Sequence, residues 1–437
     1  MRVGDGRIAR SGEQVAVVSA TGERPRVLIL GGGFAGVGAA QKLKDADADV
    51  VLVDRHDYHT FQPLLYQLAT GLLDTTAVGH SLRDLLARHD NTTIRKASVA
   101  AVDLDTREVA FGELAPIVYD YLVLSLGAQV NFFGTEGAAQ HAFPMYTLPH
   151  AVRLKDHLLE RWEAADREPG LVADGALNVV VVGGGPTGVE TAGAIAELYR
   201  GNFAKDYRNV AAQDAQVTLV EAGADVFPMF KPKLREYAAK ALADRTVEVR
   251  TGTAVSSVSP TRVTLKSGDV LAAHTLVWGA GLQGNELVQS LGLELQRGNR
   301  IAVGPDLTLA DHPEVYVVGD VAAITDSKTG QVLPQLGSVA LQSGEHAGET
   351  IAHRIAGKKT KPFSYRDKGT MAAIGRGAAV VQMLRGRTMT GLKAQLAWGT
   401  VHLALLPTNE DRAKAVVSWA GAAMTHQRAG RITVEDD

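Results

Sequence analysis

Cysteine is absent from the 437 residues of this chain. Enzymes that reduce disulfides or oxidise sulfide need a reactive thiolate, so those activities are excluded. A thiolate-ligated iron–sulfur cluster and a structural disulfide are excluded for the same reason. Zinc held by histidine alone stays open, but His56 and His59 have no convincing partner pair in the sequence, and we expect no bound metal.

The sequence also lacks long apolar runs and an excess of one charge. No apolar stretch approaches the roughly 18 to 20 residues that a helix needs to cross a bilayer, so the chain is not expected to pump ions by itself. Its 45 lysines and arginines nearly balance 48 acids, which predicts no broad basic surface and no nucleic-acid partner. The first twenty residues mix charges without an apolar core and are no signal peptide; we expect an N-terminal extension over residues 1–23.

Glycine, in contrast, is abundant at 46 residues and occurs in two turns of one pattern. Residues 31–36 and 183–188 both read Gly-x-Gly-x-x-Gly, each after an apolar strand-like run and before helix-forming sequence. The first glycine permits the tight turn, the second lets backbone approach a pyrophosphate, and the third lets helix pack on strand. The phosphates then lie at the helix N-terminus, which favours anions. The sequence therefore predicts an α/β protein that binds two dinucleotides.

An acidic residue ends the second strand of each unit. Asp54 lies 21 positions after Gly33, the distance at which a carboxylate accepts hydrogen bonds from ribose hydroxyls. Glu221 lies 36 positions after Gly185 because residues 200–213 lengthen the connection. A carboxylate there repels a 2′-phosphate, and no arginine follows at once, so NADH is preferred over NADPH.

Two more apolar strands end on small or acidic residues. One ends in Ser125-x-Gly127 and is expected near a bound adenosine or pyrophosphate, although burial alone also explains it. The other ends in Gly319-Asp320, and an acid at the carboxyl end of a parallel strand lies where open α/β sheets bind ligands. A solvated turn aspartate is the alternative.

Together these motifs resemble those of the type II NADH dehydrogenases, which are single-subunit, non-proton-pumping NADH:quinone oxidoreductases of the two-dinucleotide-domain flavoproteins. The match covers roughly residues 24–430, and its most discriminating strings are 183–190 and 367–369. The resemblance implies two Rossmann-like domains, FAD bound in the first and NADH in the second, and a C-terminal helical segment. The strings that carry it are residues 31–36, 59–67, 183–190, 278–281, 319–320 and 367–369.

The resemblance also implies domain bounds and cofactor contacts. The expected domains are an FAD-binding domain over 24–144 and 301–370, an NADH-binding domain over 145–300, and a membrane-association or dimerisation segment over 371–437. The expected cofactor-binding residues are Gly31, Gly33, Phe34, Ala35, Gly36, Asp54, Arg55, Val99, Ser125, Gly127, Gly183, Gly185, Pro186, Thr187, Gly188, Glu221, Gly281, Gly319 and Asp320.

Three residues are candidates for the active site. Glu190 is expected in the first turn of the second helix, where a carboxylate often only complements the dipole; in the resembling family it faces nicotinamide and flavin, which favours an orienting role. Gln342, on a helix predicted from about residue 334, matches a quinone-contacting glutamine of the family, whereas Ser338 stands where glutamine is common. Lys368 matches a lysine near flavin and acceptor, although a surface lysine in a turn is the ordinary alternative.

The C-terminal segment predicts attachment to a surface. A helical wheel over 392–406 puts apolar residues on two opposite faces, and both must be buried. A second helix is predicted from Arg412 to about Thr425, and after residue 370 eight lysines and arginines face five acids. These features favour a peripheral enzyme of the respiratory chain on the cytoplasmic face of the cell membrane. The polar stretch 407–411 keeps a homodimer interface open, and the two are compatible.

The sequence leaves more than one hypothesis for the electron acceptor. The resemblance implies that the acceptor is a quinone. The second hypothesis is a soluble NADH-dependent flavoprotein with a protein or small-molecule acceptor. Ser338 and the polar stretch 407–411 support it. A non-catalytic flavin-bound NADH sensor is the third.

Overall fold

The computed structural model describes residues 24–425, which form two compact units. The two units are defined by how compactly their residues pack, whereas the domains expected from the sequence are defined by the cofactor that each would bind. The expected domain bounds therefore stay a prediction. The expected extension over residues 1–23 lies outside the described residues. Unit 1 comprises residues 24–57, 82–128 and 284–365, and unit 2 comprises residues 58–81, 129–283 and 366–425.

A parallel sheet forms the centre of unit 1. The strand order is β22 (Val315–Val317), β9 (Tyr121–Leu124), β1 (Arg26–Leu30), β2 (Asp49–Asp54), β5 (Thr92–Lys96). Strands β22, β9, β1 and β2 are apolar along nearly their whole length because both faces of the sheet are covered there, whereas the edge strand β5 is mostly polar. The chain extends from β1 to one side and returns on the other, so the switch in strand order lies at the carboxyl end of β1, where open sheets bind ligands.

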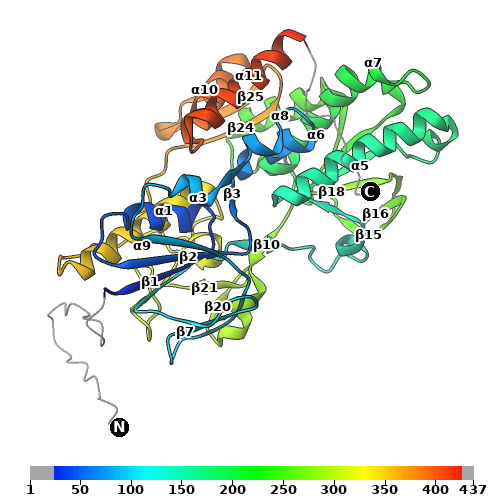
Figure 1. Ribbon diagram of the computed structural model, residues 1–437. Helices are drawn as coiled ribbons and strands as arrows, with labels where there is room; N and C mark the ends of the chain where they lie inside the picture. Colours follow the sequence, from blue (N-terminus) through cyan, green and yellow to red (C-terminus); the bar gives the residue numbers. More distant parts are fainter. Residues whose placement is uncertain (1–23, 426–437) are drawn as a thin grey trace. The chain divides into compact units, whose positions relative to one another are not determined.

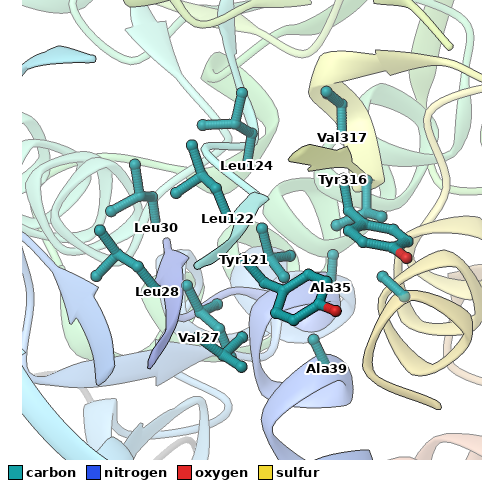
Figure 2. Close-up of a cluster of buried hydrophobic side chains, with 14 of the residues drawn as sticks. Val27, Leu28, Leu30, Ala35, Ala39, Tyr121, Leu122, Leu124, Tyr316 and Val317 are labelled. Carbon is teal, nitrogen blue, oxygen red and sulfur yellow. The ribbon is translucent and has the colours of Figure 1, made fainter. Parts of the chain in front are cut away.

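Two helices pack closely in unit 1, α1 (Phe34–Lys42) and α9 (Gly337–Ile355). A Cβ at Gly344 would overlap the carbonyl of Ala35, and one at Gly348 would overlap that of Ala39. Figure 2 shows Ala35 and Ala39 beside the buried side chains of β1, β9 and β22. The small residues therefore bring the two backbones, and with them the two helix starts, close together.

Smaller elements complete unit 1. An antiparallel sheet of β6 (Val99–Asp103), β7 (Glu108–Phe111) and β8 (Ile117–Val118) follows β5. The other elements are α3 (Leu82–Leu85), β20 (Leu295–Gln296), β21 (Arg300–Ala302) and β23 (Ala322–Ala323).

Unit 2 repeats the parallel sheet. The predicted long connection at 200–213 falls on short helical turns after α6 (Pro186–Leu198), packed by the rings of Trp162, Tyr199 and Phe203. The strand order is β11 (Phe143–Pro144), β18 (Thr275–Trp278), β12 (Val179–Val182), β13 (Val217–Val220), β14 (Val247–Arg250). Other elements are α4 (Ala138–His141), α5 (Leu148–Arg167), α8 (Pro232–Ala243), β15 (Val255–Ser259), β16 (Arg262–Leu265) and β17 (Val270–Ala272).

The C-terminal part of unit 2 is a small antiparallel sheet followed by two helices (Figure 1). The second helix begins at Asn409, three residues before the predicted start, because Thr408 and Asp411 cap it reciprocally. Within residues 24–425, none of the helices has both the length and the apolar character to cross a bilayer. The elements are β24 (Thr370–Gly375), β25 (Ala378–Gln382), β26 (Thr388–Thr390), α10 (Gly391–Leu405) and α11 (Asn409–Thr425).

The predicted fold class is confirmed: each unit carries a Rossmann-like parallel sheet, and helices close the chain. The sequence signals were strong here because a buried parallel strand and a glycine turn are both local patterns.

Candidate active site

The glycine turn of unit 1 is a tight cradle at the end of β1. Gly31 has a φ of 106°, and a Cβ at Gly36 would overlap the Gly31 carbonyl oxygen. The Ser125 hydroxyl donates to the Leu30 carbonyl at 2.8 Å and supports the turn from β9. At Gly33, in contrast, a Cβ would have no described atom of another part of the chain within 4 Å. The turn is therefore closed toward the protein and open at its second glycine, which fits a pyrophosphate.

Two helix N-termini meet at this cradle. Neither Gly33 before α1 nor Leu336 before α9 provides a capping side chain. A Cβ at Gly337 would lie 3.6 Å from the Phe34 ring, so the two helix starts are neighbours. Because each N-terminus carries about half a positive charge, the pair favours an anionic ligand.

The carboxyl end of β22 adjoins the same place. Gly319 has a φ of 72°, and its N–H donates to the Ser343 hydroxyl of α9 at 3.0 Å. A Cβ at Gly319 would lie 3.1 Å from that of Ala35 in α1. The Gln335 amide donates to the main-chain carbonyl of Asp320 at 3.0 Å. The predicted Gly-Asp pair thus lies beside the starts of both helices.

The turn of unit 2 has the same construction. Gly183 has a φ of 110°, and a Cβ at Gly188 would overlap its carbonyl oxygen. No described atom lies within 4 Å of a Cβ built at Gly185, which precedes α6 without a capping side chain. Gly279, after β18, packs on the helix start, since its Cβ would lie 3.1 Å from the Gly188 nitrogen.

An acid closes each turn in the same way. Asp54 Oδ2 accepts the Gly32 N–H at 2.6 Å, and its other oxygen accepts a backbone N–H two residues on. Glu221 Oε2 accepts the Gly184 N–H at 2.5 Å, and Oε1 accepts the Gly223 N–H at 2.6 Å. A carboxylate has about four acceptor positions, so each retains capacity for ribose hydroxyls.

Glu190 is a buried carboxyl. It is the fifth residue of α6, so the expectation that it lies in the first turn was wrong; Pro186 starts the helix earlier than the third glycine suggests. Its Oε1 accepts the Ala373 N–H of β24 at 3.0 Å. Desolvation by burial raises the pKa of Glu190 to about 8, and the Ala373 hydrogen bond opposes the shift. Burial therefore favours the protonated carboxyl at neutral pH, and a neutral carboxyl does not complement the helix dipole.

The two acceptor candidates lie in different units. Gln342 is partly buried on α9 of unit 1, and Lys368 is exposed just before β24 of unit 2. Gly369 has a φ of 88°, and its N–H donates to Asp367 Oδ1 at 2.8 Å. Ser338, which departs from the family pattern, has its hydroxyl 2.9 Å from the Tyr365 hydroxyl.

The remaining predicted cofactor residues lie at the starts and ends of elements. They are Phe34 and Ala35 at the start of α1, Arg55 exposed after β2, Val99 at the start of β6, Gly127 with a φ of 68° after β9, Pro186 and Thr187 at the start of α6, and Gly281 with a φ of 71° after β18. In the described part of the chain, residues 24–425, no group of three or more metal-ligating side chains gathers.

The contact between β24 and α6 was not predicted. A Cβ at Gly193 would overlap the Ile374 carbonyl, and Glu197 Oε1 accepts the Arg376 N–H at 2.5 Å and the Arg245 Nε–H at 2.8 Å. The one local signal was Gly193 itself, a glycine inside a helical pattern, which often marks close approach of another backbone.

The C-terminal helices are anchored by buried polar contacts within unit 2. His80 Nδ1 lies 3.0 Å from Asp411 Oδ2, and both side chains are buried. Burial lowers the pKa of His80, while Asp411 opposes the shift. The Trp419 indole N–H donates to Gln67 Oε1 at 2.7 Å. The polar stretch 407–411 thus caps α11 and anchors it to His80. Its polar residues are explained by these contacts, so they do not argue against membrane contact by the apolar side chains of α10 and α11.

Both C-terminal helices expose large apolar side chains. On α10, Ala394, Trp398 and His402 are buried. Val401 and Leu405, which the helical wheel places on the same side of the helix as Ala394 and Trp398, are 39% and 47% exposed, so the expectation that this face is buried was wrong for these two residues. Leu392 and Leu396 on the other face are 62% and 64% exposed. Large apolar side chains are exposed at Leu392, Leu396, Val401 and Leu405 of α10, at Val416, Val417 and Met424 of α11, and at Met383 and Leu384 between β25 and β26.

Known proteins resemble the chain in sequence and in fold. The family described as pyridine nucleotide-disulphide oxidoreductase matches residues 25–344. The type II NADH:quinone oxidoreductase NdhA of Mycobacterium tuberculosis is 35% identical over 427 residues, covering 94% of this chain and 89% of that protein. The type II NADH:quinone oxidoreductase of Staphylococcus haemolyticus is 30% identical over 383 residues, covering 85% and 92%. NDH2 from Plasmodium falciparum, solved in complex with NADH, has a TM-score of 0.85 at 18% identity, covering 94% of this chain and 100% of that chain.

Proposed function

The chain belongs to the pyridine nucleotide-disulphide oxidoreductase family and, within it, to the type II NADH:quinone oxidoreductases, and from this membership we propose that it passes electrons from NADH through FAD to a quinone. The observation that carries the proposal is the pair of acid-closed glycine turns, one in each unit. The absence of cysteine leaves no thiol to carry electrons between donor and acceptor.

The residues of unit 1 fit FAD. The turn at 31–36 would receive the pyrophosphate and Asp54 the adenosine ribose, while the starts of α1 and α9 favour negative charge on the cofactor. When bound, FAD supplies a flavin ring that accepts a hydride from NADH at N5 and delivers two electrons to the quinone. In unit 2, the turn at 183–188 and Glu221 would hold NADH and disfavour the 2′-phosphate of NADPH.

One cuvette experiment tests donor, cofactor and acceptor. The purified protein should show a flavin spectrum, bleach on anaerobic addition of one equivalent of NADH, and recover its colour on addition of a short-chain quinone. A protein that stays colourless after incubation with FAD contradicts the proposal. Bleaching without reoxidation by quinone would instead favour the soluble flavoprotein alternative, with another acceptor.

We assign Glu190 an orienting role toward NADH. Oε1 is engaged by the Ala373 N–H, so the protonated carboxyl can offer its O–H to a ligand at the start of α6. Hydride transfer needs positioning of the nicotinamide more than proton movement. Gln342 and Lys368 are the residues proposed for the quinone, Gln342 through its amide and Lys368 through its charge.

The Glu190→Gln variant should separate the role of Glu190 in orienting NADH from the effect of its protonation state. The amide retains an acceptor for Ala373 and a donor for the ligand, so flavin reduction at neutral pH should stay within about three-fold of wild type. The wild-type rate should fall as the pH passes through about 8, where Glu190 ionises, and the variant rate should not. Stopped-flow reduction by NADH from about pH 6 to 10 measures both. A pH break of equal size in the variant contradicts the role.

The same variant has a stability signature. The unfolded carboxyl ionises at its ordinary value of 4.5 and the folded one at about 8, so the folded state binds one more proton between these pH values. The free energy of unfolding of wild type should therefore fall, relative to Glu190→Gln, as the pH rises through this window. Urea unfolding at the two ends of the window tests this independently of activity.

We further propose that the exposed apolar surface of α10 and α11 rests on the cytoplasmic face of the cell membrane, where the quinone of a respiratory chain dissolves. Leu392 and Leu396 supply apolar area, and the excess of lysine and arginine after residue 370 would face anionic lipid. A second copy of the chain is the alternative occupant of this surface, as a homodimer.

The double variant Leu392→Glu/Leu396→Glu should release the protein from membranes. Losing two apolar anchors and adding two negative charges should lower partition onto anionic liposomes at least about ten-fold. Sedimentation with vesicles measures the effect, and Val270→Glu, at a 54% exposed site on β17, is the matched control. Unchanged sedimentation together with a shift from dimer to monomer would assign the surface to a second copy instead.

A further inference from the structure

One phenylalanine of unit 2 is both exposed and held in an unfavourable backbone conformation. Phe133 lies between β10 (Ala128–Val130) and α4 and is 66% exposed. It is the one Phe, Tyr or Trp side chain among residues 24–425 that is exposed. Its φ of 51° is left-handed, a region that costs a non-glycine residue without a small polar side chain roughly 1 kcal/mol or more. Within unit 2, neither burial nor a favourable backbone accounts for this residue.

The surrounding loop enforces this conformation. The Phe133 N–H donates to Asn131 Oδ1 at 2.7 Å, and the Asn131 N–H donates to the Gly281 carbonyl at 3.1 Å. The Trp278 indole N–H donates to the Asn131 carbonyl at 3.1 Å, and the Phe132 ring packs on Trp278 with centroids 5.3 Å apart. Phe132 and Asn131 therefore secure the loop to the end of β18, while the Phe133 ring projects from it.

The ring lies directly over Gly281. A Cβ at Gly281 would overlap the Phe133 ring, and the φ of 71° at Gly281 also demands glycine. Two residues earlier, Gly279 packs on the Gly188 backbone at the start of α6. Phe133 is thus linked through the short run 279–281 to the dinucleotide turn.

Strand order tells which half of a dinucleotide would meet this ring. Glu221, proposed for the adenosine ribose, follows β13, on one side of β12 and its glycine turn. Gly281 and Phe133 follow β18, on the other side of β12. A dinucleotide whose pyrophosphate lies on the turn and whose adenosine lies over β13 must extend its second half across β18.

We propose that Phe133 is a positioning residue that packs its ring on the nicotinamide-ribose half of NADH. This inference rests on the proposed NADH site at 183–188. An aromatic side chain with a restrained backbone loses little conformational freedom on binding, so it can orient a flat heteroaromatic ring at low entropic cost. The backbone strain at Phe133 is then the cost of holding the ring beside Gly281 before the ligand arrives.

The test replaces the ring and keeps the backbone. Asparagine tolerates the left-handed region, so Phe133→Asn should fold with an unfolding midpoint equal to or above that of wild type. Its KM for NADH should rise about ten-fold, with kcat at saturating NADH and the KM for a short-chain quinone within about two-fold. Phe133→Tyr keeps the aromatic ring and should restore the wild-type KM.

Truncated ligands locate the contact. Reduced nicotinamide mononucleotide contains only the half expected on Phe133, so its KM should rise in Phe133→Asn as that of NADH does. ADP lacks both the nicotinamide and its ribose, so its inhibition constant should not change. An unchanged KM for NADH, or weaker inhibition by ADP together with an unchanged KM for the reduced mononucleotide, overturns the proposal for Phe133. Failure of wild type to oxidise NADH at all would overturn the proposed function instead.

Discussion

Gly36→Ala should prevent the formation of a flavin-binding unit 1. A Cβ at this position would overlap the Gly31 carbonyl oxygen and approach the Ser125 hydroxyl to 2.9 Å. Backbone carbonyls of a turn at the end of a buried strand cannot rotate away as a side chain can. We expect a loss of more than about 4 kcal/mol in the free energy of unfolding, with little soluble protein and no bound flavin. Soluble yield, flavin absorbance and thermal unfolding measure this.

Gly33→Ala is the matched control within the same turn. Gly33 has a φ of −74°, and no described atom lies within 4 Å of its built Cβ, so alanine fits the folded protein. The added methyl group projects into the space proposed for the pyrophosphate. The variant should therefore fold like wild type and bind FAD more weakly. If both variants fold and retain FAD equally, the turn at 31–36 does not receive the pyrophosphate.

Glu221→Arg should reverse the coenzyme preference. The substitution removes the acceptor proposed for two ribose hydroxyls, each hydrogen bond to a charged group contributing about 1.5–3 kcal/mol, and adds a cation suited to a 2′-phosphate. The kcat/KM for NADH should fall at least about 100-fold, and that for NADPH should rise relative to wild type. Steady-state kinetics with both donors measure the change.

A control separates ribose binding from the shape of the turn. Glu221 also accepts the Gly184 and Gly223 N–H groups, so a substitution disturbs the loop as well as the ligand. Glu221→Gln keeps one acceptor oxygen and removes the charge, and it should weaken NADH less than arginine without improving NADPH. Unchanged NADH kinetics in both variants would show that Glu221 is not the ribose ligand.

The apolar surface of the C-terminal helices shows where sequence patterns reach their limit. The helical wheel over 392–406 predicted two apolar faces, both buried. The structure buries Ala394, Trp398 and Leu406 and leaves large apolar side chains of both faces exposed, Leu392 and Leu396 on one and Val401 and Leu405 on the other. The polar residues at 407–411 were read as a sign of an ordinary interface. They prove to cap α11 and pair with His80, which lies more than 300 residues away in the sequence. A sequence pattern indicates that a helix is amphipathic, but it does not predict which distant residue a polar side chain will contact.

The sequence by itself determined the two dinucleotide turns, their acids and the absence of thiol chemistry. These features are readable because each depends on neighbours within a strand, a turn and a helix: a glycine where no Cβ fits, an acid where a strand ends. Only the tertiary structure decided the character of Glu190, since its burial and raised pKa come from β24, nearly 200 residues further along the chain. It also decided that Phe133 stands exposed over Gly281, because that contact joins loops from two distant parts of unit 2. Desolvation and contact depend on what packs around a side chain, and no local pattern records that.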